Sequence, residues 1–124
     1  MPAPLTLRTA VLAAACAAAA APALAGPSRT LTTRDFRVTV TQRCAEGDIG
    51  CRNATYRGTN RRTGATIRLR GAVMVRMCAD GVTPCGVLGY RFTRGRFVYR
   101  VTEGGTLLVT RGSRVLVRQP GRWS

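Results

Sequence analysis

From Phe36 onward, apolar and polar residues alternate along the chain with a period of two. In the first such segment, Phe36, Val38 and Val40 take every second position and polar residues stand between them. This alternation predicts β-strands that bury one side and expose the other. By the same pattern, strands are predicted over residues 36–41, 54–62, 66–70, 73–77, 87–92, 96–101, 106–110 and 114–118.

Turn-forming residues stand in nearly every gap between these segments, at Thr63-Gly64, Arg94-Gly95, Gly104-Gly105 and Gly112-Ser113. Gly71 is expected to separate the strands over 66–70 and 73–77. Strand signals about every 10 residues, joined by short connections, favour strands that pair with their sequence neighbours. We therefore predict an all-β fold, a small antiparallel meander of about eight short strands that forms a barrel or a sandwich.

The first 25 residues have the three parts of a secretory signal peptide. Arg8 supplies the positive charge, residues 11–21 form an apolar run, and Ala23-Leu24-Ala25 matches a cleavage site. A transmembrane anchor is the alternative, but Pro22 interrupts the run, which is shorter than the roughly 20 residues that a spanning helix needs. A cleaved signal helix implies a periplasmic or secreted bacterial protein with no transmembrane segment after cleavage.

The rest of the chain is divided by composition. We expect a flexible lead-in over residues 26–35, which is polar and contains Pro27, then a single β domain over residues 36–119 and a tail over residues 120–124.

A lipoprotein signal that keeps Cys16 as the acylated residue is a further alternative for the N-terminus. It is disfavoured because Ala13 stands where such signals usually carry leucine.

Cleavage would remove Cys16 and leave four cysteines, an even number that suits an oxidising compartment. They form two pairs with the same spacing, Cys44 with Cys51 and Cys78 with Cys85. Turn chemistry inside each loop favours two local disulfides, each worth roughly 2–3 kcal/mol by loop entropy. Pairing across the loops stays open, because four cysteines allow three connectivities. A zinc or redox role is disfavoured because the chain has no C-x-x-C pair.

The charge balance is strongly basic. Cleavage would remove one of the 20 arginines, Arg8, which leaves 19 arginines, five acidic residues and a net charge of +14. Arginine in place of lysine suggests a GC-rich genome, but codon bias does not remove Asp and Glu. The excess therefore indicates attraction to phosphate- or carboxylate-rich partners, and the alternative is a soluble surface that is basic without a function.

Catalytic residues are scarce. The chain has no histidine, the commonest general base and metal ligand. Glu46 and Asp48 are the only acidic residues close in sequence, and Asp80 before Gly81 suits a turn. We therefore predict that the protein is not an enzyme and uses no cofactor and no metal.

The arginines are the candidate binding residues. Six of them take outward positions on successive predicted strands, namely Arg68, Arg70, Arg76, Arg91, Arg96 and Arg100. If these strands are neighbours, the six side chains form a basic face that suits lipopolysaccharide, another anionic polysaccharide or an acidic protein, because guanidinium binds such groups through paired hydrogen bonds. No specific nucleic acid is predicted, because the aromatic residues follow the core series instead of the outer face.

Three motifs suggest a resemblance that covers roughly residues 44–101. They are Tyr56-x-Gly58, Thr63-Gly64-x-x-Ile67-x-Leu69-x-Gly71 and Cys78-Ala-Asp80-Gly81-x-Thr83-Pro84-Cys85. In these motifs the chain resembles a group of short, secreted, uncharacterised proteobacterial proteins. In size, predicted location and strand count it is also similar to the periplasmic lysozyme inhibitors, which are small antiparallel barrels. The resemblance implies a secreted β protein and carries over no activity.

Three functions follow as hypotheses. The first is a binding module whose arginine face engages an anionic envelope polymer or an acidic protein. The second is an inhibitor of a cell-wall hydrolase that acts through the loop from Ala79 to Pro84. The third is an enzyme with an unrecognised site near Asp80, Glu46 or Asp48.

Overall fold

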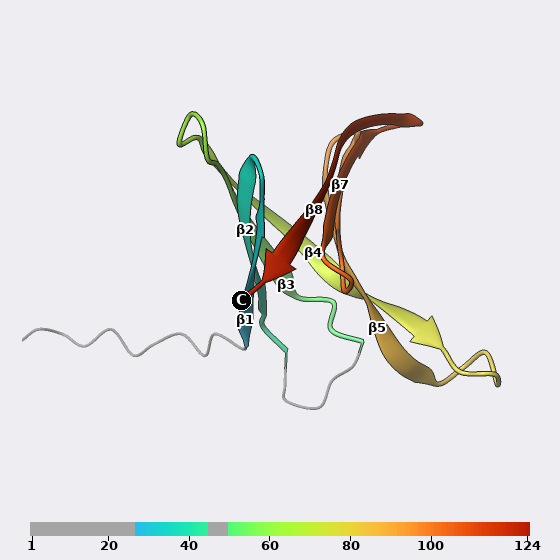
Figure 1. Ribbon diagram of the computed structural model, residues 1–124. Coiled ribbons are helices and arrows are strands. Elements are labelled where there is room, and N and C mark those ends of the chain that lie inside the picture. Colours follow the sequence, from blue (N-terminus) through green and yellow to red (C-terminus); the bar gives the residue numbers. More distant parts are fainter. Residues whose placement is uncertain (1–26, 45–49) are drawn as a thin grey trace, which may run out of the picture.

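A computed structural model describes residues 27–44 and 50–124, which form a closed barrel of eight antiparallel strands (Figure 1). The predicted all-β class is confirmed, the barrel is the alternative that forms, and no helix occurs in the described residues. The predicted signal peptide, Cys16, Glu46 and Asp48 lie outside them. The strands are β1 (Ser28–Thr33), β2 (Phe36–Gln42), β3 (Ala54–Asn60), β4 (Thr66–Met77), β5 (Pro84–Arg94), β6 (Phe97–Thr102), β7 (Thr106–Arg111) and β8 (Arg114–Trp123).

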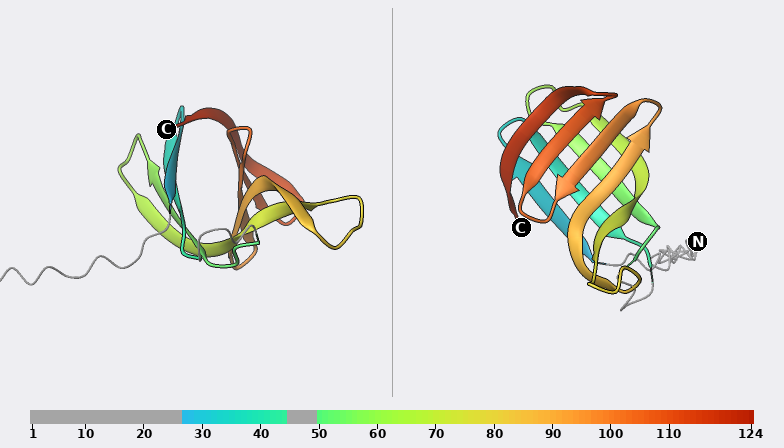
Figure 2. Two further views of the ribbon diagram at one scale, coloured as in Figure 1. Left: turned by 90° about the horizontal axis from the view of Figure 1, so that it is seen from below. Right: turned by 90° about the vertical axis from the view of Figure 1, so that its right-hand side faces the viewer.

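Each strand pairs with the next, as the predicted meander requires, and β8 returns to pair with β1. The closing register sets Leu31 opposite Trp123 and Thr33 opposite Gly121. Seen from below, the strands form a ring (Figure 2, left). Closure pairs β1 with β8, so neither terminal strand is left as the edge of an open sheet.

The predicted flexible lead-in over 26–35 and the predicted tail over 120–124 are wrong, because both segments contribute strands to the barrel. β1 lies inside the supposed lead-in, and β8 continues through Trp123. The alternation of apolar and polar residues did not predict β1, because Leu31 is the only large apolar residue of this strand. Thr33, in the same phase as Leu31, is buried and donates a hydrogen bond to the Gln119 side chain at 2.8 Å.

The predicted break at Gly71 is also wrong, since residues 66–77 form the single strand β4. The glycine permits a close approach of two strands instead. A Cβ atom at this position would lie 2.0 Å from the backbone oxygen of Arg91 and 2.6 Å from the Phe92 ring. The strand count stays at eight because β1 is gained where two predicted strands merge.

A β-bulge bends the β4–β5 hairpin away from the barrel (Figures 1 and 2). Met74 pairs with Gly89 and Val75 pairs with Val87, so Leu88 is the extra residue. Gly89 has φ of +149°, and a Cβ atom there would lie 2.2 Å from the oxygen of Val101. Glycine therefore allows this bend, as bulges at barrel corners commonly do.

The barrel interior is filled by the inward residues of the alternating series. Tyr90 and Phe92 are fully buried, and the Tyr56 ring lies 5.2 Å from the Phe92 ring and 5.4 Å from the Tyr99 ring. Aromatic side chains of this size bury the most apolar area per residue and stabilise the core accordingly. The buried apolar residues are Leu31, Val38, Val40, Cys51, Ala54, Tyr56, Leu69, Val73, Tyr90, Phe92, Val101, Leu107 and Val109.

One of the two predicted disulfides is present, between Cys44 and Cys51. This bond excludes pairing across the two loops. Cys78 and Cys85 are free thiols in contact, and a hydrogen bond between them raises the pKa of Cys78 above its ordinary value. Their proximity is compatible with the second predicted bond, which stays a prediction.

Candidate functional site

A basic groove of about 490 Å³ crosses the outer face of β2, β3 and β4. We call it the outer groove. Strand phase puts its polar side chains on the outside, because the alternate residues of these strands fill the core. The polar residues that line it are Thr39, Thr41, Arg43, Thr55, Arg57, Arg68 and Arg70.

Strand register places these residues in two rows. In one row Thr39 is opposite Arg57, which is opposite Arg68. In the other row, Thr41 is opposite Thr55 and Thr55 is opposite Arg70. Neighbouring strands lie about 4.8 Å apart and successive outward residues about 6.8 Å apart, so one ligand can contact several of these side chains.

The Arg57–Arg68 pair is unfavourable for folding. Both side chains are exposed, and like charges directly opposite each other on a sheet face are destabilising. Hydroxyl groups on the same face are ordered, because Thr39 and Thr41 share hydrogen bonds of 3.1 Å and 2.7 Å with Thr30 and Ser28 on β1. The outer groove thus presents positive charge beside fixed hydroxyl groups.

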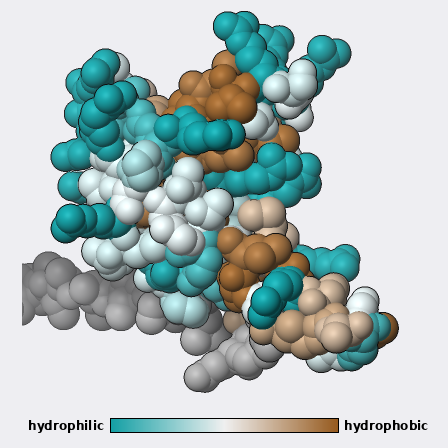
Figure 3. All heavy atoms as spheres, turned by 45° about the vertical axis from the view of Figure 1, so that its right-hand side comes forward, coloured by the Kyte–Doolittle hydropathy of each residue, from teal (hydrophilic) through white to brown (hydrophobic). Residues whose placement is uncertain are grey.

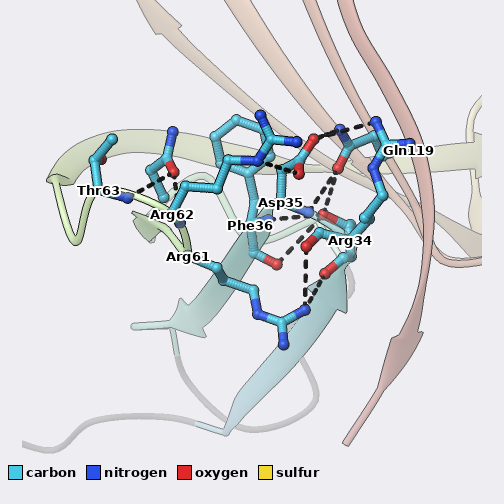
Figure 4. A network of polar contacts seen from close by, with 9 residues as sticks. Arg34, Asp35, Phe36, Arg61, Arg62, Thr63 and Gln119 are labelled. Atoms are coloured by element: carbon cyan, nitrogen blue, oxygen red, sulfur yellow. Dashed lines mark hydrogen bonds and ion pairs between the residues drawn. The ribbon is translucent and has the colours of Figure 1, made fainter.

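Asp35 is one of three carboxylate side chains in the described residues. Its contacts link chain segments at one end of the barrel (Figure 4). It accepts a hydrogen bond of 2.6 Å from the Gln119 amide and pairs with Arg34 and Arg62 at 3.3 Å each. The Gln119 hydrogen bond, followed by Arg34, holds the pKa of Asp35 below its ordinary value. This carboxylate joins the β1–β2 turn, the β3–β4 turn and β8.

The other two described carboxylates are also engaged away from the groove. Glu103 accepts hydrogen bonds of 2.7 Å and 2.9 Å from Arg29. Asp80 accepts bonds from the Thr83 hydroxyl, the Thr83 amide and the Val82 amide within its own loop, which lower its pKa to about 2.

The described residues supply no counterion to the outer-groove arginines. Among residues 27–44 and 50–124, no carboxylate pairs with Arg43, Arg57, Arg68 or Arg70. An exposed cluster of unneutralised guanidinium groups is a surface for binding anions.

The six predicted site residues do not share one compact face. Arg68 and Arg70 line the outer groove. Arg91 lies diagonal to Arg70 in the register and directly opposite Arg100, so these two extend the basic surface onto β5 and β6. The remaining two are separate. Arg76 lies over Gly86 within the β4–β5 hairpin, and Arg96 lies at the β5–β6 turn.

Sequence reasoning missed Arg43, Arg57 and the three threonines of the outer groove. Arg57 stood in the outward phase of a segment that was predicted as a strand. A hairpin register about the Thr63-Gly64 turn would have set it against Arg68, so strand pairing was the signal that could have found it.

Comparison of the chain with protein-family models, with curated proteins and with solved structures finds no match. The resemblance stated from the sequence motifs therefore stays a prediction. In the described part of the chain, no group of three or more Cys, Asp or Glu side chains is placed to hold a metal ion. The same residues contain no helix that is both long and apolar enough to span a membrane.

Proposed function

We propose that this protein is a non-enzymatic binding module, periplasmic or secreted, whose outer groove binds an anionic envelope polysaccharide. One observation carries the proposal. Four arginines line a groove beside ordered threonine hydroxyls, while the described carboxylates are engaged elsewhere.

The chemistry of the groove favours a sugar polymer over an acidic protein. Guanidinium groups bind carboxylate or phosphate through paired hydrogen bonds, and hydroxyl groups both donate to and accept from sugar hydroxyls. The rows of side chains extend across three strands, so an extended chain with repeating charges can occupy several arginines at once. The Cys44–Cys51 disulfide suits the oxidising compartment in which such polymers occur.

The test is binding of a heparin oligosaccharide, a uronic polymer with no acyl chain, across a salt series. The groove variant replaces Arg57, Arg68 and Arg70 with glutamine. The matched control replaces Arg94, Arg96 and Arg111 with glutamine, which removes the same charge from another surface. We expect the groove variant to lose about 100-fold in affinity and the control about threefold or less, because only the first removes direct contacts.

Equal losses in the two variants would mean that heparin responds to net charge alone. That result would refute the outer groove as a site. A circular-dichroism melt of each variant shows that the barrel is intact before the affinities are compared.

Inhibition of a cell-wall hydrolase is the second candidate, and one observation favours it. The loop that contains Asp80 projects from the barrel, and the Val82 side chain at its tip is 78% exposed. Hydrogen bonds from Val82 and Thr83 to Asp80 fix the loop shape, as in a preorganised inhibitory loop. Unchanged lysozyme turnover in the presence of excess protein would dispose of this candidate.

A further inference from the structure

The barrel has an apolar cavity at the end where the β1–β2, β3–β4, β5–β6 and β7–β8 turns lie. Its volume is about 290 Å³, and its apolar lining includes Phe36, Ile67, Phe97, Leu107, Val109 and Val117. We call it the mouth. Its size is near the lower end of ligand-binding cavities, which suits one slender hydrocarbon chain.

Strand pairing is incomplete beside the mouth. The described pairing of β4 with β5 begins at Gly71, so the first part of β4, residues 66–70, is paired only with β3. Apolar surface also continues outside, because Val115 and Leu116 on β8 are 48% and 43% exposed. Figure 3 shows one hydrophobic region near the top of the molecule, flanked by hydrophilic groups, and a second one lower on the same face.

A second hollow, of about 450 Å³, adjoins the mouth and shares Phe97 and Tyr99 with it. Its charged lining is Arg94, Arg96 and Arg111, which we call the rim arginines. The Arg111 guanidinium lies 5.6 Å from the centre of the Phe97 ring. No described carboxylate pairs with any of the three.

Tyr56 supplies a polar group to the mouth. The residue is only 2% exposed and lines the cavity, and burial raises the pKa of its hydroxyl above its ordinary value.

We propose that the mouth binds a single-chain anionic amphiphile of the fatty-acid class. The hydrocarbon chain enters between Phe36, Ile67 and Val117, and the carboxylate contacts the rim arginines. Charge complementarity selects this occupant, because an apolar cavity beside three guanidinium groups that no described carboxylate pairs with matches a molecule with one apolar and one anionic end. The site is independent of the outer groove, and neither proposal requires the other.

The test is calorimetric titration of the full chain with monomeric dodecanoate, and with dodecanol and acetate as the tail-only and head-only probes. We expect saturable binding of one dodecanoate, weaker binding of dodecanol and none of acetate. The rim variant, Arg94→Gln/Arg96→Gln/Arg111→Gln, should lower the affinity for dodecanoate about tenfold or more. It should change the affinity for dodecanol about twofold or less.

Two further variants separate the mouth from general effects of charge. Val117→Phe, which narrows the cavity, should lower the affinity for dodecanoate and the affinity for dodecanol by similar factors. The groove variant carries the same charge loss as the rim variant and should bind dodecanoate within about twofold of the parent. The proposal is overturned by equal weakening in the rim and groove variants, by an absence of saturable binding, or by binding only to vesicles of anionic phospholipid.

Discussion

Arginine has opposite roles in two regions of this barrel, the seam where β1 meets β8 and the outer groove on β2, β3 and β4. At the seam, Arg29 is paired with Glu103 and lies 4.1 Å from the centre of the Trp123 ring, and the Trp123 indole donates to the Glu103 backbone oxygen at 3.0 Å. In the outer groove, Arg57 and Arg68 face each other with no described carboxylate beside them.

The contrast separates arginines that stabilise the fold from arginines that are available to a ligand. A paired guanidinium that stacks on an aromatic ring contributes to folding through charge and dispersion. Two guanidiniums on adjacent strands, paired with no described carboxylate, oppose folding slightly and attract anions. Net charge describes both regions alike, so the position of the counterions is the informative property.

The largest effect is expected at the seam. Trp123→Ala should lower the free energy of unfolding by about 3 kcal/mol, since it removes a large aromatic side chain together with its contacts to Arg29 and Tyr90. Guanidinium chloride unfolding measures the loss. The groove variant should stay within about 0.5 kcal/mol of the parent protein, and destabilisation of the two by the same amount would contradict the division of roles.

Giving the outer groove a counterion should make it resemble the seam. Thr39→Glu places a carboxylate opposite Arg57 in the register. We expect heparin affinity to fall about tenfold and the free energy of unfolding to rise by about 0.5 kcal/mol. Thr32→Glu, on the outer side of β1, is the control for added negative charge, and an equal fall in affinity there would count against a local site.

Removing the counterion at the seam should have a smaller effect. Glu103→Gln should lower the free energy of unfolding by about 0.5 kcal/mol, because both side chains of the ion pair are partly exposed, 35% for Arg29 and 43% for Glu103. Heparin affinity should not change. The loss of stability should shrink in high salt, whereas a loss that is independent of salt would show that the charge pair is not its source.

Acid titration should reveal the role of Asp35. Its pKa is lowered in the folded protein, chiefly by the Gln119 hydrogen bond, so the unfolded chain binds the proton more tightly. The stabilisation is therefore present above the ordinary carboxyl pKa and is lost as the pH falls below about 4. Asp35→Asn should flatten this part of a plot of melting temperature against pH, and an unchanged slope would contradict the contribution of Asp35.

The alternation of apolar and polar residues was sufficient to predict the fold class but not every strand. It depends on large apolar residues at alternate positions, and β1 has only Leu31. Thr33 is buried there because Gln119, far away in the sequence, satisfies its hydroxyl. Gly71 was misjudged for a similar reason, since its role depends on the closeness of β5.

The sequence predicted which arginines of the site lie on the outer face. It did not predict which residues lie opposite each other on neighbouring strands. Alternation put Arg68 and Arg70 on the outside, and strand pairing decided that Arg57 would stand beside them. The turns and the curvature of the barrel then placed Arg76 and Arg96 on other parts of the surface. Proximity across strands depends on hydrogen-bond register, and a period of two does not determine register.

We propose that the outer groove, and not the total charge, binds the polymer. The most direct measurement is nuclear magnetic resonance of isotope-labelled arginine side chains during titration with a heparin oligosaccharide. We expect the largest shifts at Arg57, Arg68 and Arg70, and small shifts at Arg118 and Arg122 on β8. Shifts of equal size at all exposed arginines would contradict it.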